Sequence, residues 1–310
     1  MRRIQRNRKE ILMARLVQCV PNFSEGRNKE IVEKIVEEIR IIDEVKLLDY
    51  SMDKDHNRSV VTFIGEPEKV IEAAFNATKT AAELIDMKTH RGGHPRMGAT
   101  DVIPLIPISD ITMEECIEYS IQLGKRIGEE LGISVFLYEK SAKSKERENL
   151  ADIRRGQYEG MAEKLKKEEW QPDFGPDILN ERAGVTAVGA RMPLVAFNVN
   201  LATGDVEIAK KIANVVRART GGFTYCKAIG LEIAERGIVQ VSMNMVDYTR
   251  TSLFRVFDTI EREAKRYGVN VIGSEIIGLV PMQALVDVAD YYLRLENFDS
   301  SQILEKRMFE

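Results

Sequence analysis

Hydrophobic positions in the first half of the chain follow two different periods. Short apolar runs of about four to eight residues indicate strands, and apolar residues that recur every third or fourth position indicate helices. Strands are expected at residues 16–20, 45–49, 59–64, 102–106 and 134–137. Helices are expected at residues 31–39, from Pro67 to about Met87, and from a capping box that begins at Thr112. The predicted order is βαββαβ, followed by one more helix and strand.

The second half of the chain repeats this order. Strands are expected at residues 194–201, 225–233, 238–246 and 269–276, and helices at 206–217, from about Thr251 and from Pro281. The segment NFSEGRNKEIVEKI at 22–35 also aligns weakly with NLATGDVEIAKKI at 200–212. We therefore predict an α+β fold of two similar ferredoxin-like halves, each with an antiparallel sheet and helices packed on one face.

The stretch from residue 141 to residue 182 is rich in charge, glycine and proline, which is typical of a link between domains. The predicted domains are a first half with this link at 14–182, a second half at 183–300 and a tail at 301–310. Residues 1–13 are basic and lack the apolar block of a signal peptide, so they are predicted to be an extension, with Met13 as the true start.

Composition and charge limit the class of protein. Hydrophobic residues make up 44% and charged residues 30% of the chain, and no apolar run approaches the roughly 20 residues of a membrane span, so a soluble cytoplasmic protein is expected. A net charge of −4 argues against nucleic-acid binding. It is still compatible with a local basic pocket that binds a small anionic ligand. The three widely spaced cysteines, Cys19, Cys116 and Cys226, are predicted to be buried thiols.

The stretch RGGHPRMGAT, residues 91–100, has the strongest local signal for chemistry. Gly92 and Gly93 allow close approach of a ligand to the main chain, and Pro95 favours an extended conformation at His94. Histidine exchanges protons near neutral pH, so His94 is a candidate acid–base group. The flanking arginines, Arg91 and Arg96, offer forks for carboxylates. The structural alternative is that His94 fixes the loop through a hydrogen bond.

A metal site is a second interpretation of the histidines. His56, His90 and His94 could serve as ligands, with Asp53 and Asp55 nearby in sequence. Two histidines four residues apart can bind one metal ion from the same side only when they lie on a helix. Gly92 and Gly93 between His90 and His94, and Pro95 after them, exclude a helix here. We therefore expect no metal, and a solvated loop around His56.

The segment EEWQPDFGPDILNERAG, residues 168–184, is a long irregular stretch of the kind that binds ligands or is disordered. Trp170, the only tryptophan, and Phe174 offer a flat apolar surface for an aromatic ring, and Arg182 and Arg191 offer charge for an anionic tail. The structural alternative is that Trp170 anchors the link. The small residues that follow, GVTAVGARMP, would let a strand backbone approach a ligand.

Six motifs of the chain together resemble the formiminotransferase family, in order, from about Leu16 to Asn297. The motifs are VQCVPNFSEGR, DHNRSVVTFIG, HRGGHPRMGATDVIP, QPDFGP, GARMPLVAFNVNL and IIGLVPMQAL. The resemblance implies two α+β halves with folate held between them. It also implies transfer of a formimidoyl group from N-formimidoyl-L-glutamate to tetrahydrofolate, which gives 5-formimidoyltetrahydrofolate and L-glutamate in histidine degradation.

The resemblance also assigns site residues. It gives His94 the role of catalytic acid–base group and implies tetrahydrofolate as cosubstrate, with no metal. It assigns folate binding to the stretch Gly175, Pro176, Asp177, Ile178, Leu179, Asn180, Glu181, Arg182, Ala183 and Gly184. The interior of this stretch, DILNERA, differs from the vertebrate version of the family.

Several alternatives stay open on the sequence. Members of the family with the same fold act on N-formylglutamate or formimidoylglycine, and a non-catalytic folate-binding protein is a different class. Because the chain ends at Glu310, we expect the transferase alone, with a separate cyclodeaminase acting on its product. The expected partners are small-molecule substrates and a second copy in a homodimer, without nucleic acid or membrane.

Overall fold

The computed structural model describes residues 15–307. The chain forms two compact units, one ending at Arg191 and the other beginning at Met192. Each unit has a sheet and a buried core of its own. The predicted extension at residues 1–13 and the last residues of the predicted tail lie outside the described residues.

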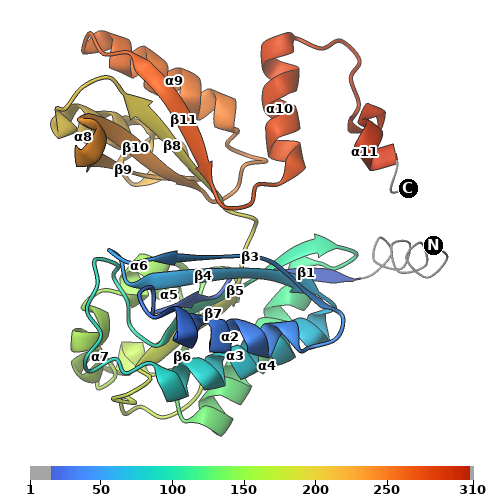
Figure 1. The fold of residues 1–310 in the computed structure, drawn as a ribbon, viewed down its shortest axis with the longest axis vertical. Helices are drawn as coiled ribbons and strands as arrows, with labels where there is room; N and C mark the ends of the chain where they lie inside the picture. Colours follow the sequence, from blue (N-terminus) through green and yellow to red (C-terminus); the bar gives the residue numbers. More distant parts are fainter. Residues whose placement is uncertain (1–14, 308–310) are drawn as a thin grey trace. The chain divides into compact units, whose positions relative to one another are not determined.

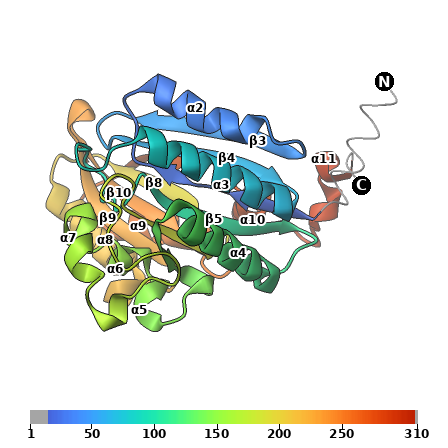
Figure 2. The ribbon, with the colours of Figure 1, turned by 90° about the horizontal axis from the view of Figure 1, so that it is seen from below.

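The sheet of the first unit has seven strands, and three long helices pack side by side on one of its faces (Figures 1 and 2). The strands are β1 Leu16–Cys19, β2 Asn22–Phe23, β3 Val45–Asp53, β4 Arg58–Gly65, β5 Thr100–Ser109, β6 Ser134–Leu137 and β7 Val185–Ala190. The helices are α2 Lys29–Arg40, α3 Pro67–Leu84 and α4 Met113–Leu131. Asn28 and Thr112 cap the first turns of α2 and α4, the latter through the predicted capping box.

The strand order of the first unit contains the predicted ferredoxin-like arrangement. β1 and β2 both lie between β4 and β5, and β3 pairs with the outer side of β4, all antiparallel. The sheet is not wholly antiparallel, because β7 pairs in parallel with both β5 and β6. Helix α4 returns the chain so that β6 runs in the same direction as β5, as a crossover connection requires.

The boundary between the units lies later in the chain than the sequence predicted, because strand β7 belongs to the first unit. All six residues of Val185–Ala190 are buried, and they pair with strands of the first unit, which ends at Arg191. The sequence placed this boundary between residues 182 and 183. The difference arises because the pairing partners of β7 are distant in sequence and leave no local signal.

The predicted link is part of the first unit and covers the other face of its sheet beside β5, β7 and β6. Along β7, Val185 faces one buried cluster and Val188 faces the other, as the alternation of a strand requires. The cluster away from α2, α3 and α4 includes Met161 of α7 and Ile153 of α6. Helices therefore lie on both faces at this edge of the sheet. The helices of the link are α5 Lys145–Glu148, α6 Leu150–Ile153 and α7 Gln157–Lys164, with 3-10 turns Glu139–Ser141 and Glu168–Trp170.

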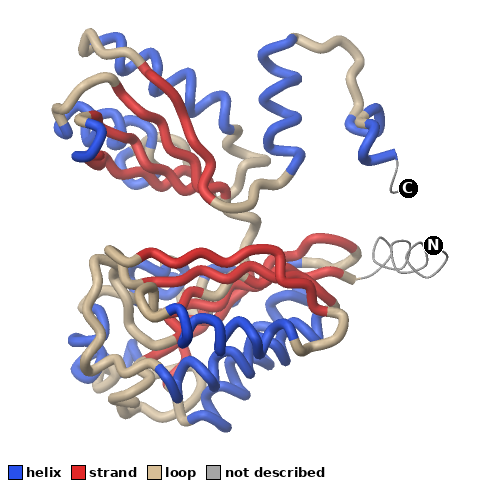
Figure 3. The backbone as a smooth tube through the Cα atoms, viewed as in Figure 1, coloured by secondary structure: helices blue, strands red, loops and turns tan. Residues whose placement is uncertain are grey.

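The second unit is a four-stranded antiparallel sheet with helices on one face, as predicted (Figure 3). Its strands are β8 Val195–Leu201, β9 Cys226–Ile233, β10 Ile238–Met245 and β11 Val271–Ile277. Its helices are α8 Val206–Val216, α9 Leu253–Arg266, α10 Met282–Leu293 and α11 Leu304–Arg307, with 3-10 turns Ala218–Thr220, Ala234–Arg236 and Ser300–Gln302. The order β11-β8-β10-β9 places the fourth strand next to the first, then the third and second, as in the core of the first unit.

Two further expectations concern cysteines and membranes. Cys19, Cys116 and Cys226 are buried free thiols, as predicted, and burial raises the pKa of all three. No helix between residues 15 and 307 combines the length and the apolar character that crossing a membrane demands.

Candidate functional site

Asn57 joins three loops of the first unit near the first residues of strands β4 and β5. It is buried and adopts a left-handed conformation with φ of 49°, which asparagine tolerates better than most residues. Its side chain accepts a hydrogen bond from Gly26 N at 2.9 Å and donates one to Arg91 O at 3.0 Å. Its own carbonyl accepts from His90 Nε2 at 3.0 Å. One residue thus holds the SEG turn and the loop before His94 in place.

His90 has a structural role in this arrangement. The residue is 6% exposed, its ring Nε2 donates to Asn57 O, and its Nδ1 accepts a hydrogen bond from Arg96 Nε at 3.2 Å. Both ring nitrogens are used by the protein, and burial lowers the pKa of His90, so the ring stays neutral. In this state it has no lone pair left for a metal ion.

Arg96 is also occupied within the protein. Its guanidinium donates to both carboxylate oxygens of Glu159 at 2.8 and 2.6 Å and to Gln157 at 3.1 Å. Hydrogen bonds from Arg96 lower the pKa of Glu159 to about 2. The sequence suggested that the guanidinium of Arg96 binds a substrate carboxylate. In the structure this guanidinium binds Gln157 and Glu159 of helix α7 instead. The guanidinium of Arg91, the other predicted fork, donates to the carbonyls of Lys88 and His90.

His94 differs from His90 because its ring is not committed to strong hydrogen bonds. Main-chain bonds from Gly93 N to Asp55 O (3.1 Å) and from His94 N to His56 O (3.4 Å) hold its backbone against the neighbouring turn. Ring Nδ1 lies 3.4 Å from Arg58 Nη1, a long contact. Ring Nε2 lies 4.0 Å from Asp101 Oδ2, is buried and has no hydrogen-bond partner. An uncommitted, 13% exposed imidazole fits the predicted acid–base role better than the structural alternative.

The charges around His94 come from three separate elements. Arg58 begins β4, Asp101 lies in β5 and Arg154 follows α6. Asp101 Oδ1 accepts from Met97 N at 2.8 Å, and Oδ2 forms an ion pair with Arg154 Nη2. Burial, followed by the charges of Arg58 and Arg154, lowers the pKa of His94 to about 3. The ring is therefore neutral at physiological pH and able to accept a proton.

The turn that contains His56 is closed by its own residues. Asp53 Oδ1 accepts from the backbone N–H groups of Asp55 and His56, and Asp53 Oδ2 lies 2.7 Å from His56 Nδ1. This turn is exposed, as predicted for the loop around His56. Between residues 15 and 307, no three histidine, cysteine, aspartate or glutamate side chains are placed to hold a metal ion.

The predicted folate segment, residues 175–184, is fixed at both ends. Gly175 has φ of 82°, and a Cβ there would lie 2.3 Å from Ile133 O. Gly184 has φ of 72°, and a Cβ there would lie 2.3 Å from Met97 O. Near this end, the side chain of Asn180 accepts from the backbone N–H groups of two following residues. The segment thus ends beside Met97, in the same loop as His94, while Ile178 in its middle is 74% exposed.

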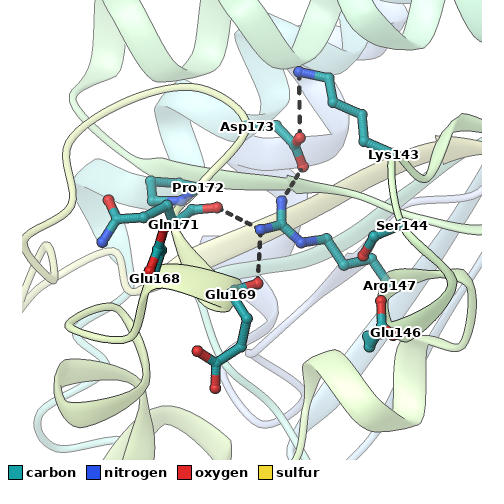
Figure 4. Close-up of a pocket in the computed structure, with 9 residues that line it drawn as sticks. All are labelled: Lys143, Ser144, Glu146, Arg147, Glu168, Glu169, Gln171, Pro172 and Asp173. Atoms are coloured by element: carbon teal, nitrogen blue, oxygen red, sulfur yellow. Dashed lines mark hydrogen bonds and ion pairs between the residues drawn. The ribbon is translucent and has the colours of Figure 1, made fainter.

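A buried ion pair holds the start of this segment (Figure 4). Arg147 Nη1 donates to Asp173 Oδ2 at 3.0 Å, and Nη2 donates to the carbonyls of Glu169 and Gln171. The same Asp173 oxygen accepts from Leu137 N at 2.8 Å, which ties the QPDFGP motif to β6. Arg147, Asp173 and the two residues whose carbonyls accept from Arg147 line a cavity of about 420 Å³, which is separate from the cluster around His94.

Trp170 anchors the link, which was the structural alternative for this residue. Its ring meets Phe136 edge-on, with centroids 6.0 Å apart. Lys164 Nζ lies 3.8 Å from the centroid of the indole and donates to the carbonyls of Asp152 and Ile153. Burial lowers the pKa of Lys164 to about 8. Arg182, predicted to offer charge to a ligand, donates to Glu83 O at 2.6 Å.

Two family descriptions cover almost all of the chain. "Formiminotransferase domain, N-terminal subdomain" matches residues 16–191, and "Formiminotransferase domain" matches residues 196–308. The chain belongs to the formiminotransferase family. The two matches meet between Arg191 and Val195, where the two units also divide.

Curated relatives of this formiminotransferase chain cover it nearly completely. A glutamate formimidoyltransferase of Streptococcus pyogenes serotype M1 is 57% identical, over 96% of this chain and 99% of the relative. One of Thermoplasma acidophilum is 50% identical, over 94% and 97%. A formimidoyltransferase-cyclodeaminase of Sus scrofa is 43% identical over 92% of this chain, which matches only 54% of that longer relative.

The sequence did not single out three neighbours of His94 in this formiminotransferase. Asp101 could have been found as a lone carboxylate at the start of an apolar strand, in the motif GATD. Arg58 is the last residue of the predicted polar loop SMDKDHNR, and its charge was not distinguished from the other charges of that loop. Arg154 gave no signal, because only the folding of the link against the sheet brings it to Asp101.

We expect acid to destabilise this protein through its buried histidines. In the folded state the pKa of His94 lies near 3, whereas an unfolded chain binds the proton near pH 6.5. The unfolded state therefore takes up more protons as pH falls below 6.5, and the free energy of unfolding decreases. Linkage gives an upper limit of about 2 kcal/mol for His94 between pH 7 and pH 5.

Urea denaturation at pH 7 and pH 5 measures this effect. The variant His94→Gln lacks the titrating ring and should lose less stability over the same interval than the wild type. An equal loss in both proteins would show that His94 titrates normally in the folded state.

Proposed function

We propose that this chain is a glutamate formimidoyltransferase, which transfers the formimidoyl group of N-formimidoyl-L-glutamate to tetrahydrofolate and releases L-glutamate. Relatives of this name at 57% and 50% identity, nearly end to end, support the activity. The observation that carries the chemistry is His94, a neutral imidazole without a strong hydrogen-bond partner, in a loop held by Asn57 and by the turn at residues 55–56.

The reaction requires two proton movements. The bond between the formimidoyl carbon and the glutamate nitrogen is replaced by a bond from that carbon to N5 of tetrahydrofolate. One proton leaves N5, and one proton is added to the departing nitrogen. His94 accepts the first proton in its neutral form and returns it to the nitrogen of glutamate, so the ring is neutral again after each turnover.

Residues 175–184 are proposed to hold the folate. The segment has firmly anchored ends and an exposed apolar side chain at Ile178, which suits an aromatic ring. Its end at Gly184 adjoins Met97, so a ligand along the segment lies near the loop of His94. Positioning of both substrates would supply the acceleration that proton transfer alone does not reach, since acid–base catalysis contributes roughly 10²- to 10⁴-fold.

A side-by-side assay of three donors tests the proposed activity. Purified protein with tetrahydrofolate should form its product fastest, by kcat/KM, from N-formimidoyl-L-glutamate. N-Formylglutamate and formimidoylglycine are the alternative donors. A higher kcat/KM for either would reassign the substrate, and folate binding without turnover of any donor would identify a non-catalytic folate-binding protein.

The anchor of the folate segment gives a second expected result. Arg147→Met should raise KM for tetrahydrofolate by about 3- to 10-fold with kcat within about twofold, because the start of the segment loses three hydrogen bonds to one side chain. Tetrahydrofolate should also protect residues 168–184 of the wild type from limited proteolysis.

Lys143→Met is the matched control for Arg147→Met. Lys143 contacts the same carboxylate, Asp173, at 3.3 Å, but its side chain is 57% exposed, and exposed ion pairs contribute little. Its kinetics should match those of the wild type. An unchanged KM in Arg147→Met, together with an unprotected segment, would remove residues 175–184 from the folate site.

The last part of the proposal concerns the oligomeric state of the enzyme and the enzyme that acts on its product. We propose a cytoplasmic homodimer whose product is consumed by a separate cyclodeaminase. The relative from Sus scrofa carries both activities in its name and is nearly twice as long as the matched region. Sedimentation of the purified protein at micromolar concentration tests the dimer, and a monomer there would contradict it.

A further inference from the structure

Arg58 is a half-buried cation that forms no ion pair with any carboxylate between residues 15 and 307. Its Nη1 lies 3.4 Å from His94 Nδ1, and its Nε is buried without a hydrogen-bond partner. Burial, followed by the charge of Arg154, lowers the pKa of Arg58. Asp53 and Asp101 attract this charge from beyond ion-pair distance, so the guanidinium is desolvated without a direct counter-ion among the described residues, which is costly.

Other arginines of the first unit do not share this state. Arg147 and Arg154 are also largely buried, but each forms an ion pair with a buried aspartate. Arg27 and Arg182 lack a carboxylate partner as well, but both are exposed and donate to backbone carbonyls. Unlike these four arginines, Arg58 combines partial burial with the lack of an ion pair.

The carboxylates near Arg58 are already used. Asp101 pairs with Arg154 and accepts from Met97 N. Asp53 accepts two backbone N–H groups and pairs with His56. His94 is neutral and adds no negative charge. Both carboxylates are thus engaged by other groups and neither forms an ion pair with Arg58, whose planar guanidinium matches the geometry of a carboxylate.

We propose that Arg58 binds the α-carboxylate of the amino-acid donor and thereby places the departing nitrogen beside His94. This assignment rests on the proposed function. In an N-formimidoyl amino acid, the α-carboxylate and the nitrogen that leaves are attached to the same carbon. A carboxylate bound at Arg58, whose guanidinium contacts His94, therefore brings that nitrogen to the acid–base group.

Donor binding at Arg58 also prepares His94 for proton transfer. In the free protein Nδ1 of the ring faces the guanidinium. Burial, followed by the charges of Arg58 and Arg154, depresses the pKa of His94 far below neutrality, which makes it a weak base. A carboxylate bound to Arg58 neutralises that charge and raises the pKa of the ring toward neutral pH. The donor thus activates the base that acts on it.

The α-carboxylate is common to all three candidate donors. Arg58 therefore sets the class of donor, an N-substituted α-amino acid, and does not distinguish glutamate from glycine. Substitution at Arg58 should weaken all three donors by the same factor.

Two amides of the product test the assignment. L-Glutamine keeps the α-carboxylate and loses the γ-carboxylate, whereas L-isoglutamine has an α-amide and keeps the γ-carboxylate. We expect the ratio of the inhibition constants of isoglutamine and glutamine, against the donor, to fall by roughly 10- to 100-fold in Arg58→Met, since that is the loss expected for a hydrogen bond to a charged group. Arg58→Lys keeps the positive charge without the planar guanidinium, so its ratio of inhibition constants should lie between those of the wild type and Arg58→Met. Arg27→Met, an exposed arginine of a neighbouring loop, should match the wild type.

Three further measurements keep the result unambiguous. Arg58→Met should raise KM for the donor and leave KM for tetrahydrofolate within about twofold. Saturating L-glutamate should raise the pKa of His94, followed by NMR, in the wild type and not in Arg58→Met. The variant should also melt a few degrees higher than the wild type, because an uncompensated buried charge is removed.

Each opposite outcome overturns the assignment. An unchanged ratio in Arg58→Met shows that the α-carboxylate binds elsewhere, and an equal rise of KM for tetrahydrofolate shows that Arg58 holds a carboxylate of the folate. A lower melting temperature marks Arg58 as a structural residue. Binding of glutamine and glutamate is measured without turnover by calorimetry, so a failure of the proposed transferase activity is seen separately in the donor assay.

Discussion

Replacing His94 by alanine should lower kcat by roughly 10²- to 10⁴-fold, the usual span for a lost acid–base group, and leave the Michaelis constants little changed. The fold should persist, because the backbone of the loop is held by Asn57 and by the hydrogen bonds of Gly93 and residue 94 to the turn at 55–56. Affinity for tetrahydrofolate should be nearly that of the wild type. Steady-state kinetics and equilibrium folate binding measure both quantities.

Asparagine at position 94 serves as the control for hydrogen bonding. An amide can donate and accept hydrogen bonds but cannot take up and return a proton near neutral pH, so His94→Asn should be as inactive as His94→Ala. If the alanine variant keeps more than about a tenth of the wild-type turnover, His94 is a loop anchor. His56, which pairs with Asp53 in the adjacent turn, is then the next residue to test.

The repeated fold could be predicted because amphipathic periods carry it. In α2, Val32, Ile35, Val36 and Ile39 are the buried positions, and their spacing alone indicates the helix. Strand β7 has no such signature, because VTAVGA is buried on both faces and its partners are β5 and β6. Parallel pairing across such a distance in sequence depends on the tertiary fold. The predicted boundary at residue 182 was displaced for this reason.

Only part of the candidate site was visible in the sequence. His94 could be singled out because its glycine and proline neighbours act locally. The structural role of His90, only four residues away, could not be predicted, because it depends on contacts with Asn57 and Arg96. The unpaired charge of Arg58 is a property of burial and of missing partners, neither of which a sequence records.

Gly92 and Gly93 should respond very differently to the same substitution, although both precede His94. A Cβ at Gly92 would lie 2.3 Å from His56 O and 2.6 Å from Asn57 Cβ, so the loop must move. A Cβ at Gly93 would lie 3.6 Å from Asp55 O, an ordinary contact. We expect Gly92→Ala to lower kcat by roughly 10- to 100-fold, since a shift of about 1 Å in a catalytic group costs that much, and to lower the melting temperature by several degrees.

Gly93→Ala is the matched control for this prediction, with the same added methyl group one residue closer to His94. Its kcat should stay within about twofold of the wild type and its melting temperature within about two degrees. Equal damage in both variants would mean that the loop needs the backbone freedom of two glycines rather than the close approach of Gly92 to the turn at 56–57. Normal kinetics in Gly92→Ala would mean that the loop can move without displacing the His94 ring, and that its position is set by Arg58 and Asp101 instead.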